Sequence, residues 1–381
     1  MALHFTPEEF ADRQSRAARA VADAGLEAIL LFAPESHYWL TGYDTFGFAM
    51  FQCMVLTAGG DIALLTRPPD RLQALETSVL TEGQIHLWVD RAGVAPAEEL
   101  KWLVSAMGVR GRIGIETRTA GLTHANGRAV EAAMGELVEA SDLMPALRRV
   151  KSPAEIAHIR RAAELSDDAL DAAIATARPG AFEGDILAAM QGAVFRGGGG
   201  YAGNEFILGS GSTALLCRSH AGRRHLDATD QLTLEWAGTH ARYHAAMMQT
   251  LVIGTPSDAQ RAMHAAAQEA LEACEAAIRP GRPMSEVYDA HARAFDAHGF
   301  QHARMKACGY PMGAIFAPIW VEFPMFYEGN ALEMQENQVF FLHMILMDDT
   351  AGLAMCLGHS VLVGANGVER LSRHAPDLIS L

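Results

Sequence analysis

Several residue types are scarce in this chain of 381 residues. The five cysteines are odd in number, far apart and without a CxxC pair, which excludes a disulfide framework and a zinc knuckle and is typical of a reducing compartment. There are 30 basic against 45 acidic residues, a formal net charge of −15, so nucleic acid and anionic membranes are excluded as partners held by charge. Aromatic residues make up 7% of the chain, too few for a base-stacking platform.

Long hydrophobic runs are also missing from the sequence. The longest apolar stretches, such as 338–347, are about ten residues, whereas a membrane span needs about 20. The first 16 residues carry three acidic and two basic side chains, which is unlike a signal peptide. We therefore expect a cytoplasmic protein that does not associate with membranes.

The pattern of hydrophobic residues, which are half of the chain, predicts two domains. In the first part, helix-like segments alternate with short apolar runs such as 28–32 and 62–66, which indicates an α/β domain. Ser152-Pro153-Ala154-Glu155 is then a capping box with proline at the first helical position, and it begins a long amphipathic helix. We place the boundary before this helix, which gives domains 1–150 and 151–381.

The second domain contains an internal repeat. Arg178-Pro179-Gly180 and Arg279-Pro280-Gly281 each follow a long helix-like segment and precede a shorter one, and the two prolines lie 280 − 179 = 101 positions apart. Strand-like segments follow each shorter helix. This pattern predicts an α+β domain built from two related halves, with a ligand cleft between their sheets.

Segment 215–254 is the richest in side chains that can carry chemistry. Glu235 lies in an apolar strand, and a turn expected at 238–242 joins this strand to a second one. A carboxylate that is buried without a partner costs on the order of several kcal/mol. Glu235 is therefore either a functional group or the partner of a nearby arginine. The candidate partners are Arg223, Arg224 and Arg242.

Three histidines are each open to two interpretations. His220 lies in the polar loop before the Glu235 strand, and is either solvated or an acid–base group. His343 is the one polar residue of the hydrophobic stretch 339–347, and is either a core histidine or a site residue. His359 precedes another apolar strand, and is either a solvated strand end or functional.

An aromatic patch follows Leu40-Thr41-Gly42-Tyr43-Asp44 in the first domain. It comprises Phe46, Phe48 and Phe51. These rings form either the edge of the hydrophobic core or an aromatic lid on a small ligand, and the pattern alone leaves both possibilities open.

Together these residues resemble the creatinase/aminopeptidase P/prolidase family, whose C-terminal domain has the pita-bread fold. The resemblance extends over nearly the whole chain and is greatest to the metal-independent branch of ectoine hydrolase and creatinase. It implies an α/β N-terminal domain and an α+β pita-bread C-terminal domain. The matching stretches are 40–44 (LTGYD), 149–156 (RVKSPAEI), 235–238 (EWAG), 242–244 (RYH), 326–330 (FYEGN) and 340–343 (FFLH).

The metallopeptidases of this family hold two metal ions with two Asp, one His and two Glu. By resemblance, the corresponding positions are Glu235, Ala246, Tyr310, His343 and either Gly358 or His359. At most two or three of these residues could bind a metal, and they are not the oxygen-rich set that paired divalent ions need. The resemblance therefore implies a site with no metal and no other cofactor.

The resemblance also implies the reaction: metal-independent hydrolysis of a C–N bond in a small polar non-peptide molecule, such as an ectoine- or creatine-like amidine or amide. In this hypothesis Glu235 attacks carbon or activates water, His220 protonates the leaving nitrogen, and His343 holds Glu235 or the substrate. The residues expected to contact the substrate are Tyr43, Phe46, Phe48, Tyr243, His244, Tyr310 and His359.

Two further expectations concern partners and alternatives. The family forms homodimers in which an N-terminal domain caps the neighbour's site, so we expect a homodimer in which Tyr43 acts across the interface. Besides the small-molecule hydrolase, the sequence leaves open an Xaa-Pro aminopeptidase-like metallopeptidase with an altered metal site. It also leaves open a catalytically inactive homologue that binds a compatible solute.

Overall fold

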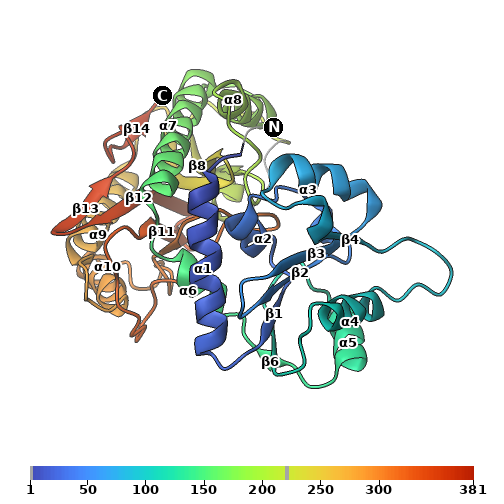
Figure 1. Ribbon diagram of the computed structural model, residues 1–381. Coiled ribbons are helices and arrows are strands. Elements are labelled where there is room, and N and C mark those ends of the chain that lie inside the picture. The colour runs from blue at the N-terminus through green and yellow to red at the C-terminus, as the bar shows by residue number, and fades with distance from the viewer. Residues whose placement is uncertain (1–2, 219–222) are drawn as a thin grey trace. The chain divides into compact units, whose positions relative to one another are not determined.

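A computed structural model describes residues 3–218 and 223–381, which belong to two units, Met1–Arg149 and Val150–Leu381 (Figure 1). The division falls just before the helix that begins after Ser152. Ser152 Oγ accepts a hydrogen bond from Glu155 N (3.2 Å), and Glu155 Oε2 accepts one from Ser152 N (2.8 Å). The predicted capping box is thus confirmed. Within the described residues, no helix combines the length and the hydrophobicity that crossing a bilayer requires.

The first unit is an α/β domain with helices on both faces of a six-stranded sheet, in the order β4-β3-β2-β1-β5-β6. In β1, Ala28 and Leu30 pack with α4 and α5, whereas Ile29 and Leu31 pack with α1 and α6. The strands are β1 (Ala28–Leu31), β2 (Cys53–Thr57), β3 (Ile62–Thr66), β4 (Ile85–Leu87), β5 (Ile113–Ile115) and β6 (Val138–Glu139). The helices are α1 (Pro7–Asp23), α2 (Pro34–Thr41), α3 (Arg71–Thr77), α4 (Pro96–Ala106), α5 (His124–Met134) and α6 (Leu143–Arg148).

The second unit has an eight-stranded sheet whose main order is β10-β11-β12-β9-β8-β7, with β13 added to β12 and β14 added to β9. Its helices are α7 (Pro153–Thr176), α8 (Glu183–Arg196), α9 (Asp258–Ala277) and α10 (Ser285–Ala297). Its strands are β7 (Ile207–Ser210), β8 (Asp230–His240), β9 (Tyr243–Ile253), β10 (Gly309–Pro311), β11 (Val339–Asp348), β12 (Leu353–Gly364), β13 (Gly367–Arg370) and β14 (Ile379–Ser380).

The second unit consists of two halves with the same order of elements (Figure 1). Each half has a long helix, a shorter helix, a short strand and a long hairpin: α7, α8, β7, β8, β9 in one, and α9, α10, β10, β11, β12 in the other. The turns that contain Pro179 and Pro280 precede α8 and α10, at equivalent places. β9 and β12 pair antiparallel at Met248 and Gly358, which joins the halves into one sheet. The predicted internal repeat is therefore confirmed.

The β8–β9 hairpin is longer than the sequence predicted. β8 continues through Gly238 to His240, and the turn consists of Ala241 and Arg242 alone. Both turn residues are left-handed, with φ of 48° and 64°, as in the two-residue turns that match the twist of paired strands. The turn predicted at 238–242 therefore begins too early in the prediction, because β8 and β9 remain paired as far as His240 and Tyr243.

A close approach of β8 to α7 makes Gly238 necessary. A Cβ on Gly238 would lie 2.1 Å from Ala162 O and 2.5 Å from Ser166 N. We expect Gly238→Ala to lower the free energy of unfolding of the second unit by roughly 1–3 kcal/mol or more, as measured by denaturant titration. Gly200→Ala is the control, since nothing lies within 4 Å of its added Cβ. Equal stability of the two variants would contradict this close packing.

Candidate active site

Four strands place their side chains in one row across the sheet. Residues directly opposite each other in antiparallel strands have their side chains on the same face. Glu235 of β8 lies opposite Met248 of β9, Met248 lies opposite Gly358 of β12, and Gly358 lies opposite His343 of β11. Glu235 and His343, from different halves of the repeat, therefore share one face.

The short edge strand β10 adds a third side chain to this face. Tyr310 pairs with Phe341, which is two residues from His343 and therefore points the same way. The helices cover the opposite face, where the indole Nε1 of Trp236 donates to Ser166 O of α7 (2.9 Å). The face with Glu235, Tyr310 and His343 is therefore the one not occupied by α7.

Glu235 is a half-buried carboxyl group whose pKa is raised. Burial raises its pKa to about 7, although the positive charge of Arg218 and a hydrogen bond with Tyr310 act in the opposite direction. A carboxyl with this pKa is populated in both protonation states near neutral pH. It can therefore accept a proton from water in one step and return it in another.

Tyr310 is held so that its proton points to Glu235. The indole Nε1 of Trp320 donates to the Tyr310 hydroxyl oxygen (2.8 Å), and an indole can only donate. The tyrosine proton is thus left for the carboxylate of Glu235. Burial and the nearby Glu235 charge raise the pKa of Tyr310 well above its usual range, so this phenol remains protonated and acts as a donor.

His343 is a neutral group at this face. Burial lowers its pKa to about 4, and its ring lies 5.6 Å from that of Tyr310, centroid to centroid. Its Nδ1 is buried and has no hydrogen-bond partner among the described residues. At neutral pH, His343 is therefore an uncharged donor or acceptor beside the tyrosine.

Two of the residues expected to bind substrate lie on the opposite face. His359, next to Gly358, has its Nε2 2.5 Å from Glu275 Oε1 of α9. Tyr243 donates its hydroxyl proton to Glu155 Oε1 of α7 (2.7 Å). Both are buried under helices, because alternate residues of a strand point to opposite faces. His359 and Tyr243 therefore point away from Glu235, and their contact with substrate stays a prediction.

His244 lies on the Glu235 face but both of its ring nitrogens are used. Its Nε2 accepts a hydrogen bond from Gly203 N (2.9 Å), which leaves the Nδ1 proton to be donated to Arg242 O (2.8 Å). Burial lowers the pKa of His244 to about 4. His244 therefore holds the segment that contains Gly203, and its contact with substrate stays a prediction.

The expected site residues of the first unit have different environments. Tyr43 is buried, donates its hydroxyl proton to Gln52 Oε1 (3.2 Å) and stacks on His37. Phe46 is 82% exposed and Phe48 is half-buried. Their contact with a ligand stays a prediction. The remaining catalytic candidate, His220, lies outside the described residues.

Sequence reasoning missed two residues of the site, Arg218 and Trp320. Trp320 lies between strands, and no local pattern distinguishes it. The exposed Arg218 is two residues before His220, whereas the partners considered for Glu235 lay further along. Of those, Arg224 pairs with Asp230 and Arg242 lies over a phenylalanine ring, while the charge that acts on Glu235 is that of Arg218.

Comparison with known proteins identifies the class. The model of metallopeptidase family M24 matches residues 157–365, and the creatinase/prolidase N-terminal domain matches residues 13–150. The chain belongs to this family of hydrolases, and its second unit has the pita-bread fold of the family.

Individual relatives differ in their activities. The ectoine hydrolase of Halomonas elongata is 25% identical over 98% of this chain and 97% of its own. A probable dipeptidase, PepE, of Mycobacterium tuberculosis is 30% identical over 76% of each chain. The crystal structure of dipeptidase PepE from Mycobacterium ulcerans superposes with a TM-score of 0.86, at 23% identity and 99% coverage of both chains.

The residues of this chain do not fit the paired metal ions of the family's peptidases. By the resemblance, the corresponding positions hold Glu235, Ala246, Tyr310, His343 and either Gly358 or His359, and Gly358 is the one that lies opposite His343. Alanine and glycine supply no side-chain ligand, and the tyrosine is a protonated phenol engaged by Trp320. Within residues 3–218 and 223–381, no group of three or more His, Cys, Asp or Glu is arranged to hold a metal ion.

Proposed function

We propose that this protein hydrolyses a C–N bond of a small polar non-peptide molecule, an ectoine- or creatine-like amidine or amide, without a metal ion. The observation that carries the proposal is Glu235, whose pKa of about 7 suits proton transfer near neutral pH. Glu235 is hydrogen-bonded by Tyr310. By the resemblance, Tyr310 stands where the family's peptidases have a metal ligand. The ectoine hydrolase relative supports this reaction class.

The proposed reaction adds water across the C–N bond. Ionised Glu235 takes a proton from water, the resulting hydroxide bonds to the carbon, and the nitrogen leaves with a proton. Tyr310 donates a hydrogen bond that fixes the orientation of the carboxylate, and the positive charge of Arg218 stabilises negative charge at Glu235. His343, which is neutral near pH 7, offers its ring nitrogen Nδ1 as a hydrogen-bonding group to the substrate. We keep His220 as the proposed donor to the leaving nitrogen.

The PepE relatives favour a second candidate function, cleavage of dipeptides. The Xaa-Pro dipeptidase of Pyrococcus furiosus, 22% identical over 64% of this chain, suggests that these would be Xaa-Pro dipeptides. We therefore propose to assay ectoine, hydroxyectoine, creatine, N-acyl diamino acids and Xaa-Pro dipeptides, each after chelator treatment and with added Mn²⁺. The expected result is turnover of a non-peptide compound that survives chelation. Turnover of dipeptides alone, and only with Mn²⁺, would contradict the proposal.

Two parts of the proposal have separate tests. A ligand that stabilises the protein in a thermal-shift screen but is never turned over would favour the inactive binding homologue instead. The homodimer is tested by light scattering of the eluted protein, and a monomer would remove the proposed contribution of Tyr43 from a neighbouring subunit.

A further inference from the structure

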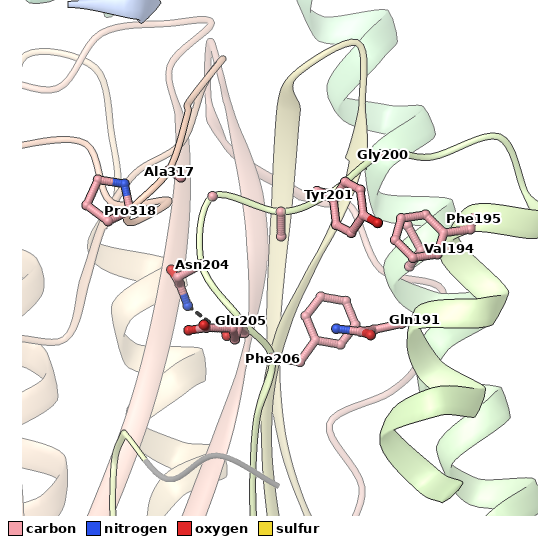
Figure 2. A pocket seen from close by; sticks show the side chains of 12 residues that line it. Gln191, Val194, Phe195, Gly200, Tyr201, Asn204, Glu205, Phe206, Ala317 and Pro318 are labelled. Atoms are coloured by element: carbon pink, nitrogen blue, oxygen red, sulfur yellow. Dashed lines mark hydrogen bonds between the residues drawn. The ribbon is translucent and has the colours of Figure 1, made fainter. Parts of the chain in front are cut away.

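The segment from Trp320 to Glu322 carries the indole that holds Tyr310, and its own backbone is fixed at both ends. At its start, Trp320 N donates to Asn204 Oδ1 (3.1 Å), and Asn204 lines the pocket shown in Figure 2. At its end, Glu322 N donates to Pro311 O (3.3 Å), next to the tyrosine. This segment is therefore bonded directly to the strand β10 that carries Tyr310.

The side chain of Glu322 forms an ion pair with Lys151, near the start of the second unit. Lys151 Nζ lies 3.4 Å from Glu322 Oε2, and the two side chains are 1% and 14% exposed. The lysine backbone is held as well, since its N donates to Asn337 O just before β11 (2.9 Å). A Cβ on Gly313 would lie 3.0 Å from both carboxyl oxygens of Glu322. The carboxylate is therefore also packed against the chain that follows β10.

Stability alone does not explain this ion pair. Taking two charges out of water has a desolvation cost that their attraction often fails to exceed, and well-packed apolar side chains of similar volume are frequently as stable. One attested use of such a pair is to select a single arrangement of packed segments. Here the arrangement in question is the position of the Trp320 segment on β10.

We propose that Lys151 and Glu322 are positioning residues for the candidate active site. Their ion pair holds Trp320 where its indole can bond the hydroxyl oxygen of Tyr310. The tyrosine proton is then directed to Glu235. The catalytic consequence of this inference rests on the proposed function, but the hydrogen bond that the ion pair holds can be observed without any substrate.

The test follows the indole Nε1–H signal of Trp320 by NMR in protein that contains isotope-labelled tryptophan. The chain has five tryptophans, and the Trp320 signal is the one that Trp320→Phe removes. Tyr310→Phe gives the position of this signal without the bond to the hydroxyl. In Glu322→Leu, and in the double variant Lys151→Met/Glu322→Leu, we expect the signal to move towards that position. At pH 7, kcat/KM should fall in both variants, by no more than in Tyr310→Phe.

Two comparisons separate positioning from charge and from general destabilisation. The double variant leaves the net charge unchanged, so a direct effect of either charge on the site cancels. It also replaces the ion pair by apolar side chains, so we expect it to fold, and it decides if thermal unfolding shows that Glu322→Leu does not. Glu322→Gln still accepts a hydrogen bond from Lys151 and should keep the Trp320 signal close to its wild-type position.

The matched control removes another largely buried ion pair of the same half. Arg304 Nε lies 2.6 Å from Asp296 Oδ1, and the arginine side chain is 7% exposed. Arg304→Met/Asp296→Leu should leave the Trp320 signal in place. A signal that stays at its wild-type position in Glu322→Leu and in the double variant, or that moves equally in the control, would overturn the inference. If the signal moves as expected but kcat/KM does not fall, the positioning stands and the part of Tyr310 in the proposed reaction is wrong.

Discussion

Replacing Glu235 by glutamine is expected to lower kcat by roughly 10²–10⁴-fold, while the dissociation constant of the substrate changes little. Glutamine keeps the shape and still accepts the hydrogen bond from Tyr310, but it can neither take a proton from water nor attack carbon. The loss should therefore appear in single-turnover rates rather than in binding. Steady-state kinetics together with calorimetry on the same preparations would separate the two.

Glu116 offers a matched control in the first unit. Burial raises the pKa of Glu116 to about 7 as well, but its carboxyl oxygens accept hydrogen bonds from Phe32 N (3.0 Å), Ala33 N (2.9 Å) and Ser36 Oγ (2.6 Å). Glu116→Gln should lower the free energy of unfolding and leave kcat unchanged. If Glu235→Gln keeps a near wild-type rate on the true substrate, the proposed mechanism is wrong.

Replacing Tyr310 by phenylalanine is expected to move the pH dependence of kcat/KM to higher pH. The hydrogen bond from Tyr310 lowers the pKa of Glu235, so its removal raises this pKa above about 7. Because the ionised carboxylate is the active form, activity is lost as the pH falls through the pKa. The midpoint of the acid limb should therefore lie near pH 7 in the wild type and higher in the variant. If the pKa rises by about one, the rate at pH 7 should be roughly fivefold lower.

Trp320→Phe is the companion variant for this experiment. It removes the indole donor that orients the tyrosine but leaves the hydroxyl in place, so its midpoint should move in the same direction by a smaller amount. Partial recovery of the Tyr310→Phe rate at higher pH would support the electrostatic explanation. An unchanged midpoint in Tyr310→Phe would show that Glu235 does not titrate in the acid limb.

The fold was predictable because its signals are local and repeated. The capping box at Ser152 begins α7, and the two Arg-Pro-Gly turns mark equivalent places in two halves of one domain. The end of β8 was mispredicted, since Gly238 suggests a turn in sequence. In the structure this glycine is required by the backbone of α7 at Ala162 and Ser166, a contact between distant segments that no local pattern reveals.

The site was predictable only in part, because its residues meet through strand register. The sequence could not decide whether Gly358 or His359 of β12 lies on the Glu235 face. The pairing of β12 with β11 decides it, because Gly358 lies opposite His343 and His359 therefore points to the other face. Trp320 was missed because its importance comes from a single hydrogen bond to Tyr310. Glu235 was found because a carboxyl group in an apolar strand is chemically conspicuous.

The seam between the two halves of the sheet has a consequence for how the protein can lose activity. β9 and β12 meet over three residue pairs, from Met247 to Gln249, whereas the hairpins β8–β9 and β11–β12 have eleven and ten. Glu235 belongs to one hairpin, and Tyr310 and His343 belong with the other. A partial opening of this seam would separate the carboxyl group of Glu235 from Tyr310, its hydrogen-bond donor, while both hairpins remained intact. Inactivation by heat or mild denaturant could then precede any loss of secondary structure.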